Sequence, residues 1–201
     1  MNAKIRQIQI TELSSVRNYV LAQPFDETVS DRSVVDADGL VRYIAFKIGD
    51  RDFGFELDKL CVITSAREIT KLSRKSKFVR GIIWVTGNVI PVVNLNEKLN
   101  LSTSKEYSEA FILVIHYKGI KLGVVVEQLP KISSISKNEI VDISNYDLDI
   151  KQEYVLTFCK KNGNGSILLD IDQILTKKDI EDIHYAVMEG QILSSATFPY
   201  G

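Results

Sequence analysis

Apolar and polar residues alternate in short runs from residue 43 onward, a pattern typical of half-buried β-strands. Clusters of Gly, Asp, Asn and Lys separate the runs, as expected of turns. The runs that predict two hairpins are 43–48 with 53–57, and 81–85 with 89–93. The single runs that predict further strands are 110–117, 121–127, 154–159 and 166–169. Pro91 lacks a backbone N–H, so we expect it where the ladder requires none, as at a sheet edge.

Helical spacing is found near the two ends of the chain. Leu13, Val16 and Val20 recur at i, i+3 and i+7, which predicts a short amphipathic helix over residues 11–20. The apolar stripe of this helix is narrow. We therefore expect it to form against a partner surface.

A second helix is predicted near the C-terminus. Thr176 is followed three residues later by Asp179, which is typical of a helix N-terminus, and the helix should continue to about Gly190. One face of this helix carries Ile180, Ile183, His184 and Val187. We expect His184 to pack against the strands rather than to bind a ligand, and residues 194–201 to fray.

A weak duplication relates two parts of the chain. Three residues recur 69 positions later: Gly54, Leu60 and Ile63 as Gly123, Leu129 and Ile132. A stretch that begins at Gly87 recurs 76 positions later from Gly163, and both copies end in the Asx-x-x-Glu/Gln form of a capping box. Each copy is too small to enclose much core alone, so two small β-barrels packed side by side are expected. Chance resemblance among hairpins is the alternative.

These patterns predict an all-β fold with two barrels of similar topology related by a pseudo-twofold axis. Short helices are expected after Asn94, near 136–140 and after Asp170. The residues predicted to form the core are Phe46, Phe55, Leu57, Ile83, Val92, Leu95, Leu113, Ile115, Val124, Val126 and Leu169.

Composition narrows the classes of protein that this chain can represent. It has 201 residues, 45% of them hydrophobic, and a net charge of −1, so it can bury a core and exerts no overall attraction on nucleic acid or anionic membranes. No apolar run is long enough to span a bilayer, and no signal peptide is evident, so we expect a cytoplasmic protein. Cys61 and Cys159 lack metal-ligand spacing and are expected to be buried structural thiols.

Residues 1–40 form a predicted N-terminal extension, partly helical and then acidic. Between Pro24 and Leu40 there are five acidic residues and one arginine, which is typical of a linker. We expect the main domain over 41–176, and the C-terminal helix and tail over 177–201.

Catalytic and cofactor motifs are missing from the sequence. There is no phosphate-binding loop, nucleophile elbow or zinc-protease motif, the only histidines available as bases are His116 and His184, and His116 lies mid-strand beside no acid. A carboxylate-based enzyme is the weakest alternative. We predict a protein that is not an enzyme and that needs no metal or cofactor.

One local cluster of positive charge stands out. Within ten residues that contain no acid, the chain carries Lys71, Arg74, Lys75, Lys77 and Arg80. A solvated loop, docking on an acidic protein surface and nucleic-acid binding are the three interpretations. The last lacks the interleaved aromatic residues that it requires, and we predict no nucleic-acid partner.

Three segments together resemble the CheW family of bacterial chemotaxis adaptors: YIAFKIGDRDFG at 43–54, FVRGIIWVTGNVIPVVNL at 78–95 and GVVVE at 123–127. The resemblance covers about residues 41–176. It implies two SH3-like five-stranded β-barrels side by side, with short helices between them and a C-terminal helix. It also implies a cytoplasmic, non-enzymatic scaffold at membrane-associated receptor arrays. That scaffold would couple the cytoplasmic tip of methyl-accepting chemoreceptors to the regulatory domain of the histidine kinase CheA.

The resemblance also implies three sets of binding residues. The receptor groove would include Leu60, Ile63, Thr86, Val89, Leu129 and Ile132. The kinase-binding segment would comprise Ile69, Thr70, Lys71, Leu72 and Phe78. A second ring interface would lie around Val141 and Tyr146.

Some positions depart from the family pattern. Thr86 stands where the family usually has an arginine associated with the receptor groove, Val62 where it has a glutamate, and Asn94 where it has an aspartate. The loop before Phe78 is basic where the family usually has proline. These departures favour, as an alternative, a divergent paralogue that binds the kinase without ordinary receptor coupling or acts in a signalling complex unrelated to motility.

Overall fold

The computed structural model describes residues 39–66, 69–101, 110–161 and 163–197. The predicted helix over 11–20 and nearly all of the acidic linker lie outside these residues. The strands are β1 (Leu40–Ile48), β2 (Arg51–Glu56), β3 (Leu60–Ser65), β4 (Val79–Val85), β5 (Asn88–Val93), β6 (Phe111–Tyr117), β7 (Ile120–Val126), β8 (Lys131–Ser136), β9 (Ile140–Val141), β10 (Val155–Lys161) and β11 (Asn164–Leu169). The helices are α2 (Ile171–Ile174), α3 (Lys177–Thr197) and the 3₁₀ turns η1 (Leu57–Lys59), η4 (Lys137–Glu139), η5 (Ile143–Asn145) and η6 (Gln152–Tyr154).

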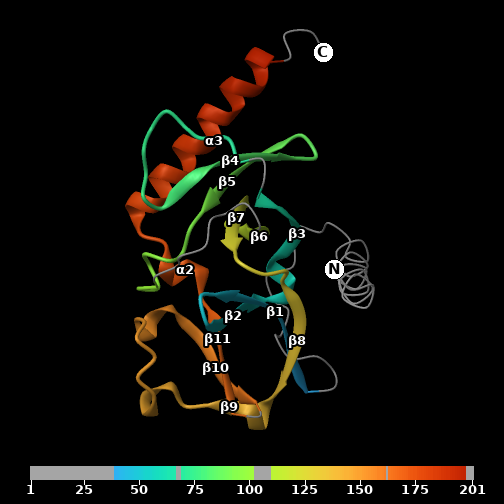
Figure 1. Cartoon of the computed structure of the whole chain (residues 1–201), viewed down its shortest axis with the longest axis vertical. Helices are drawn as coiled ribbons and strands as arrows, with labels where there is room; N and C mark the ends of the chain where they lie inside the picture. Colours follow the sequence, from blue (N-terminus) through green and yellow to red (C-terminus); the bar gives the residue numbers. More distant parts are fainter. Residues whose placement is uncertain (1–38, 67–68, 102–109, 162, 198–201) are drawn as a thin grey trace.

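The strands form two sheets, one above the other in Figure 1. The five-stranded sheet has the order β3-β6-β7-β5-β4, and the six-stranded sheet has the order β8-β1-β2-β11-β10-β9. This arrangement confirms the predicted all-β class with two similar halves. Helix α3 lies across β4 and β5, and its last turns rise past the upper sheet (Figure 1).

The strand register confirms the duplication. In the five-stranded sheet Val92 is aligned with Gly123 in a parallel pair, and in the six-stranded sheet Leu168 is aligned with Gly54 in the same way. These partners are related by the two offsets found in the sequence, 76 and 69 residues. Each sheet therefore combines a hairpin from one copy with strands of the other: β6–β7 joins β3–β5, and β1–β2 joins β8–β11.

Three apolar clusters stabilise this arrangement. The largest contains residues of both sheets together with Ile183 and Ala186 of α3, so the helix shares the central core. A second cluster lies within the five-stranded sheet, where residues of both edge strands, Val62 of β3 and Ile83 of β4, contact the same group, so the sheet curls upon itself. A third lies within the six-stranded sheet. All eleven predicted core residues are buried.

Several sequence predictions were wrong. Strands β3, β8 and β9 were not predicted individually, because β9 has two residues and β8 (KISSIS) carries few apolar side chains. The residues after Asn94 form one turn, in which Leu99 N–H donates to Leu95 O, and Asn100, with φ at 53°, follows it. The helices near 137–139 and after Asp170 are confirmed.

Pro91 lies on the inner strand β5, not on an edge. It stands opposite Ile82, whose N–H and C=O bond Thr70 on the other side of β4, and the pairing of β5 with β7 starts only at Val92. The missing N–H therefore breaks no ladder bond. An inner strand accommodates proline here because both neighbouring ladders leave this position unbonded.

Helix α3 is longer than predicted, since it continues past Gly190 to Thr197. His184 is exposed on α3. The prediction that it packs against the strands was wrong. The thiol of Cys159 is buried as predicted, whereas that of Cys61 is half-buried.

Candidate functional site: a protein-binding face on the five-stranded sheet

The segment 69–72 lies along the free edge of β4. Thr70 N–H donates to Ile82 O at 2.8 Å, and Ile82 N–H donates to Thr70 O at 2.9 Å. Gly81 makes this approach possible, because a Cβ at that position would lie 2.2 Å from Thr70 O and 2.7 Å from the side chain of Ile69. The segment is therefore held on the sheet edge by one isolated β-bridge, next to the glycine of β4.

The predicted kinase-binding residues divide into two groups. Lys71 is exposed, and Ile69, Thr70 and Leu72 are half-buried. Phe78 is only 5% exposed and belongs to the central core, with the Lys98 ammonium 5.4 Å from its ring centroid. Phe78 thus belongs to the core beneath this segment. The other four residues are the ones that a partner protein could contact.

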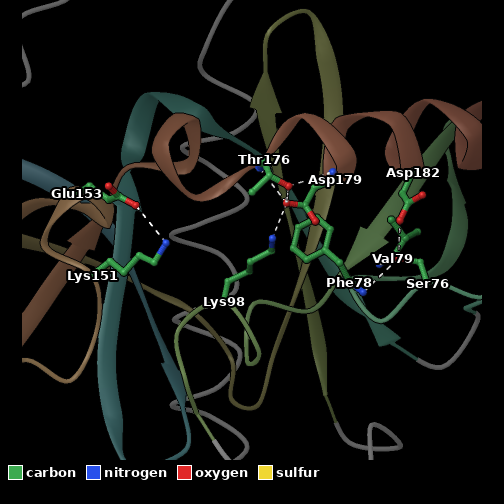
Figure 2. A network of polar contacts seen from close by, with 9 residues as sticks. All are labelled: Ser76, Phe78, Val79, Lys98, Lys151, Glu153, Thr176, Asp179 and Asp182. Atoms are coloured by element: carbon green, nitrogen blue, oxygen red, sulfur yellow. Dashed lines mark hydrogen bonds and ion pairs between the residues drawn. The ribbon is translucent and has the colours of Figure 1, made fainter.

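The basic loop that follows is held by acidic residues of α3. Arg74 forms an ion pair with Asp182 at 2.9 Å, and Ser76 Oγ donates to the same carboxylate at 2.9 Å. Ser73 N–H donates to Glu189 at 2.8 Å. Part of the basic cluster is thus held within the chain by α3, and docking on the acidic surface of another protein stays a prediction. Figure 2 shows Ser76 below Asp182.

Other charges of the basic cluster remain at the surface. The side chains of Lys71, Lys75, Lys77 and Arg80 are exposed. They border the segment 69–72 and β4. This face therefore combines half-buried aliphatic groups with a positively charged rim.

The start of α3 is fixed by a second polar cluster (Figure 2). Thr176 N–H donates to Asp179 at 2.8 Å, Asp179 N–H donates back to Thr176 Oγ1 at 3.3 Å, and the Lys98 ammonium lies 2.5 Å from the same carboxylate. Burial by itself raises the pKa of Asp179, but the hydrogen bonds from Lys98 and Thr176 outweigh it and hold that pKa below its ordinary value. The predicted capping residues are confirmed, and their effect is to anchor the helix on the sheet.

Gly190 brings α3 close to β5. A Cβ on Gly190 would lie 2.3 Å from Val89 Cγ1 and 2.8 Å from Ile82 Cδ1. Val89, which the resemblance assigns to the receptor groove, therefore lies beneath α3. The C-terminal helix covers one face of the β4–β5 hairpin.

The other receptor-groove residues are divided between the two halves: Leu60 and Ile63 belong to β3 of the five-stranded sheet, and Ile132 belongs to β8 of the six-stranded sheet. Leu60 is 8% exposed and lies in the central core, and Ile63 and Ile132 pack against that core while remaining half-buried. Leu129 is half-buried after β7. Leu60, Ile63 and Ile132 thus all contact the central core, which contains residues of both sheets.

Thr86 is exposed in the turn between β4 and β5. The φ angles of Thr86 and Gly87 are 47° and 78°, as in a type I′ hairpin turn. The turn displays the Thr86 side chain at the tip of the hairpin.

The predicted second interface lies in the six-stranded half. Val141 belongs to the edge strand β9, and Tyr146 follows η5; both are half-buried. The Tyr146 ring meets Phe158 edge to face, with centroids 4.9 Å apart, and the Lys160 ammonium is 5.7 Å from the Tyr146 centroid. These contacts fix the edge of the sheet at which both residues stand.

The described residues hold no group of three His, Cys, Asp or Glu side chains that could bind a metal ion, and none of their helices is long and apolar enough to cross a membrane. Burial raises the pKa of the Cys61 thiol to about 11, which keeps it protonated at neutral pH.

Sequence reasoning missed the contribution of α3 to this face. Asp182, Tyr185 and Glu189 hold the basic loop, and the Arg74 guanidinium lies 5.3 Å from the Tyr185 ring centroid. Their spacing of i, i+3 and i+7 places them along one side of the helix. The negative charges of Asp182 and Glu189 on this side of the helix complement the positive charges of the basic loop. That complementarity was the sequence signal that could have identified the contact.

Comparison with known proteins agrees with this architecture. The sequence matches the family described as CheW-like domain over residues 42–179, which is more than half of the chain. The chain belongs to the CheW-like family. The CheW-like match ends at Asp179, the residue that anchors α3, so most of α3 lies beyond it.

Individual relatives support the same family. The chain is 26% identical over 151 residues to the chemotaxis protein CheW of Thermotoga maritima, which covers 75% of this chain and 98% of that protein. It is 21% identical over 140 residues to the chemotaxis protein CheW of Bacillus subtilis, with 68% of this chain and 88% of that protein covered. Among solved structures, it resembles the scaffolding protein TtCheW of Thermoanaerobacter tengcongensis with a TM-score of 0.61 and 19% identity, covering 69% of this chain and 94% of the other. That likeness confirms the fold.

Proposed function

We propose that this CheW-like protein is a non-enzymatic adaptor of chemotaxis signalling that couples chemoreceptors to the histidine kinase CheA. The family match, the relatives named chemotaxis protein CheW and the neighbour described as a scaffolding protein support this role. In this proposal the protein works in the cytoplasm, at membrane-associated receptor arrays, with the domain over 41–176 as its adaptor unit.

The observation that carries the kinase-binding part is the segment 69–72 on the edge of β4. Ile69 and Leu72 are half-buried and can be covered further by a partner, while Lys71 and Lys75 stand at the rim. A few apolar anchors supply most of the energy of a standard interface, and rim charges mainly set the association rate. Ile69 and Leu72 are therefore the proposed anchors.

Titration of the kinase regulatory domain tests this assignment. Ile69→Ala or Leu72→Ala should weaken binding by about 1–3 kcal/mol if either is a hot spot. Removal of Lys75 and Lys77 together should chiefly slow association, and the effect should shrink near 1 M salt, where the Debye length is about 3 Å. Equal loss of affinity at low and high salt would reverse the roles of anchor and rim. If neither change matters, the surface around Val141 and Tyr146 becomes the candidate.

For receptor binding, we propose the half-buried residues Ile63, Leu129 and Ile132 as the apolar contacts. Leu60 supports them from the core, so an aspartate at Leu60 would chiefly test folding. Thr86→Arg restores the guanidinium that the family usually carries and should strengthen receptor recruitment. An unchanged affinity would exclude a role for the hairpin tip.

A second candidate is a divergent paralogue that binds the kinase without ordinary receptor coupling. Two observations favour it: Thr86 cannot supply a bidentate donor, and Val89 lies beneath α3. A pull-down with the CheA and the chemoreceptors of the same cell distinguishes the candidates. Recovery of both partners supports the adaptor, recovery of the kinase alone supports the paralogue, and recovery of neither contradicts kinase binding in both.

A further inference from the structure

The chain from Thr70 to Ser76 is fixed at three evenly spaced points. Thr70 is bonded to β4 through its N–H and its C=O, at 2.8 and 2.9 Å. Ser73 donates to Glu189 of α3 twice, from its backbone N–H at 2.8 Å and from its hydroxyl at 3.1 Å. Ser76 Oγ donates to Asp182 of α3 at 2.9 Å. The sheet therefore holds the first of these points, and α3 holds the other two.

Both carboxylate oxygens of Asp182 contact this part of the chain. Oδ1 lies 2.9 Å from a guanidinium nitrogen of Arg74, and Oδ2 accepts the hydrogen bond from Ser76 Oγ. The Asp182 side chain is only 10% exposed, and burial of a carboxylate is unfavourable unless the charge is paired and hydrogen-bonded. The loop supplies both kinds of contact, so Asp182 and the loop stabilise one another.

The Ser76 hydroxyl connects Asp182 with the start of β4 (Figure 2). A serine hydroxyl has one proton, and here it is donated to Asp182, so the oxygen is left to act as an acceptor. It accepts hydrogen bonds from Phe78 N–H at 3.2 Å and from Val79 N–H at 3.1 Å. Val79 is the first residue of β4, the strand that carries the bridge to Thr70. Asp182 thus orients the group that fixes the chain between the loop and the strand.

Other residues attach α3 to the rest of the protein. Ile183 and Ala186 are fully buried in the central core, and Asp179 holds the start of the helix through Lys98. The ion pair and the hydrogen bond of Asp182, in contrast, both lead to the loop. The position of Asp182 is therefore better explained by the shape of the loop than by the attachment of the helix.

The fixed points border the residues proposed to bind the kinase. Lys71 and Leu72 lie between Thr70 and Ser73; Lys71 is exposed, and Leu72 packs against the central core while remaining half-buried. A surface that is already ordered in the free protein loses less conformational entropy when a partner binds. The contacts from α3 to the loop should therefore raise the affinity of this face for its partner.

We infer that Asp182 is a positioning residue for kinase binding, which acts through Arg74 and Ser76 to hold segment 69–72 in the conformation that the kinase contacts. The inference rests on the proposed kinase-binding function of that segment. It gives α3 a part in shaping the binding face, although most of this helix lies beyond the CheW-like match.

Hydrogen exchange of the full-length chain, followed by mass spectrometry, tests the positioning. Amides of residues 70–77 should exchange about tenfold faster in Asp182→Ala than in the wild type. Asp179→Ala is the matched control, because it removes another buried carboxylate of α3 whose bonds go to Thr176 and Lys98, and it should leave these amides nearly unchanged. Protection of β6–β7 verifies that both variants fold. Equal exchange of residues 70–77 in Asp182→Ala and the wild type would overturn the inference.

Titration with the kinase regulatory domain tests the consequence for binding. In about 1 M salt, where the charge freed on Arg74 is screened, Asp182→Ala should weaken binding about fivefold to tenfold, mainly through faster dissociation. Asp182→Asn keeps one acceptor oxygen and should lose less affinity. Asp179→Ala should lower stability and still bind as the wild type does. A merely structural role of Asp182 would not produce this difference between affinity and stability.

The outcomes separate the inference from the proposed function. If the wild type binds the kinase and Asp182→Ala binds equally well, the inference alone is overturned, as it is by equal losses of affinity in Asp182→Ala and Asp179→Ala. Absence of binding by the wild type would contradict the proposed function and the inference with it. If Asp182→Ala does not fold, Ser76→Ala removes the same contact from the loop side. Unchanged affinity of Ser76→Ala would then overturn the inference.

Discussion

The β4–β5 hairpin and the β10–β11 hairpin occupy the same place in their two sheets but are covered differently. With the offset of 76 residues, Ile82 corresponds to Phe158 and Val89 to Gly165, and the cross-strand partners match. In the first hairpin, Gly190 of α3 contacts the Val89 side chain. In the second, the strand itself carries the glycine, and the Phe158 ring covers Gly165 at 2.9 Å from where a Cβ would stand.

The edges of the two hairpins also correspond. Thr70 pairs with Ile82 at the edge of β4, and Val141 pairs with Phe158 at the edge of β10. The proposed kinase-binding segment and the proposed second interface are therefore equivalent positions of one duplicated fold. The duplication preserved the ladder, while the covering groups diverged into a helix on one side and an edge-to-face pair of aromatic rings on the other. Such divergence allows one architecture to present two different binding surfaces.

The largest effect should come from the glycine at the edge of β4. Gly81→Ala places a methyl group against the backbone oxygen of Thr70, which cannot move without breaking the bridge, so we expect a loss of about 3 kcal/mol and release of segment 69–72. Thr157 stands at the equivalent position of β10, opposite Leu168 as Gly81 is opposite Val92, and Thr157→Ala is the matched control. It should change stability by less than about 1 kcal/mol. Urea unfolding measures both, and equal losses would contradict the difference drawn between the two edges.

A smaller effect is expected where α3 meets β5. Gly190→Ala forces the helix away from Val89 and should cost about 1–2 kcal/mol, since overpacking outweighs the helix propensity gained by alanine. The double variant with Val89→Ala removes the Cγ1 methyl group that lies 2.3 Å from the added Cβ and leaves Ile82 Cδ1 at 2.8 Å, so it should recover part of the loss. Unfolding curves of the four proteins in the cycle give the coupling. Additive losses would show that Gly190 and Val89 do not touch.

The anchor of α3 should make stability depend on pH. The pKa of Asp179 is lowered in the folded protein, so its contribution is present above the unfolded value near 3.8 and is lost as the pH falls through the folded value. Asp179→Asn should cost about 1–2 kcal/mol at pH 7, and the difference from wild type should disappear in acid. Asp170→Asn, which alters the cap of the four-residue helix α2 in the other half, is the comparison and should cost less. If the difference in unfolding free energy between wild type and Asp179→Asn stays constant down to about pH 3, the Asp179 carboxylate is not the cause of the pH dependence.

The smallest effect concerns the ion pair that holds the basic loop. Arg74→Met should cost less than about 1 kcal/mol because the guanidinium is partly exposed, and the loss should shrink further in 1 M NaCl. Tyr146→Leu, which removes the ring contact with Phe158 in the other half, should give a loss that salt does not reduce. Thermal unfolding at low and high salt measures both. The same salt dependence for the two variants would contradict the distinction between a charged and an aromatic cover.

Much of this architecture was predictable because local patterns and the fold agree. The hairpins, the core residues and the two repeat offsets follow from alternation and spacing, which depend only on neighbouring residues. Strand β8 was missed because its sequence, KISSIS, has few apolar side chains and so gives little local signal for a strand. The strand forms because its backbone pairs with β1. The buried position of Phe78 and the cover of Val89 by α3 depend on contacts between residues about a hundred positions apart, for which a single sequence carries no local signal.

The exchange of hairpins between the two sheets has a consequence for the order of folding. The five-stranded sheet is built from consecutive strands, β3 to β7, whereas the six-stranded sheet joins β1 and β2 to strands made after it. The first hairpin leaves the ribosome early and must wait for β11, whose Leu168 pairs with Gly54. Distant pairings form late because loop closure precedes any gain from contact. We expect amides of β6–β7 to gain protection before those of β2–β11 in pulse-labelled refolding, and the opposite order would contradict this. The earliest strands of the chain would thus complete the last sheet.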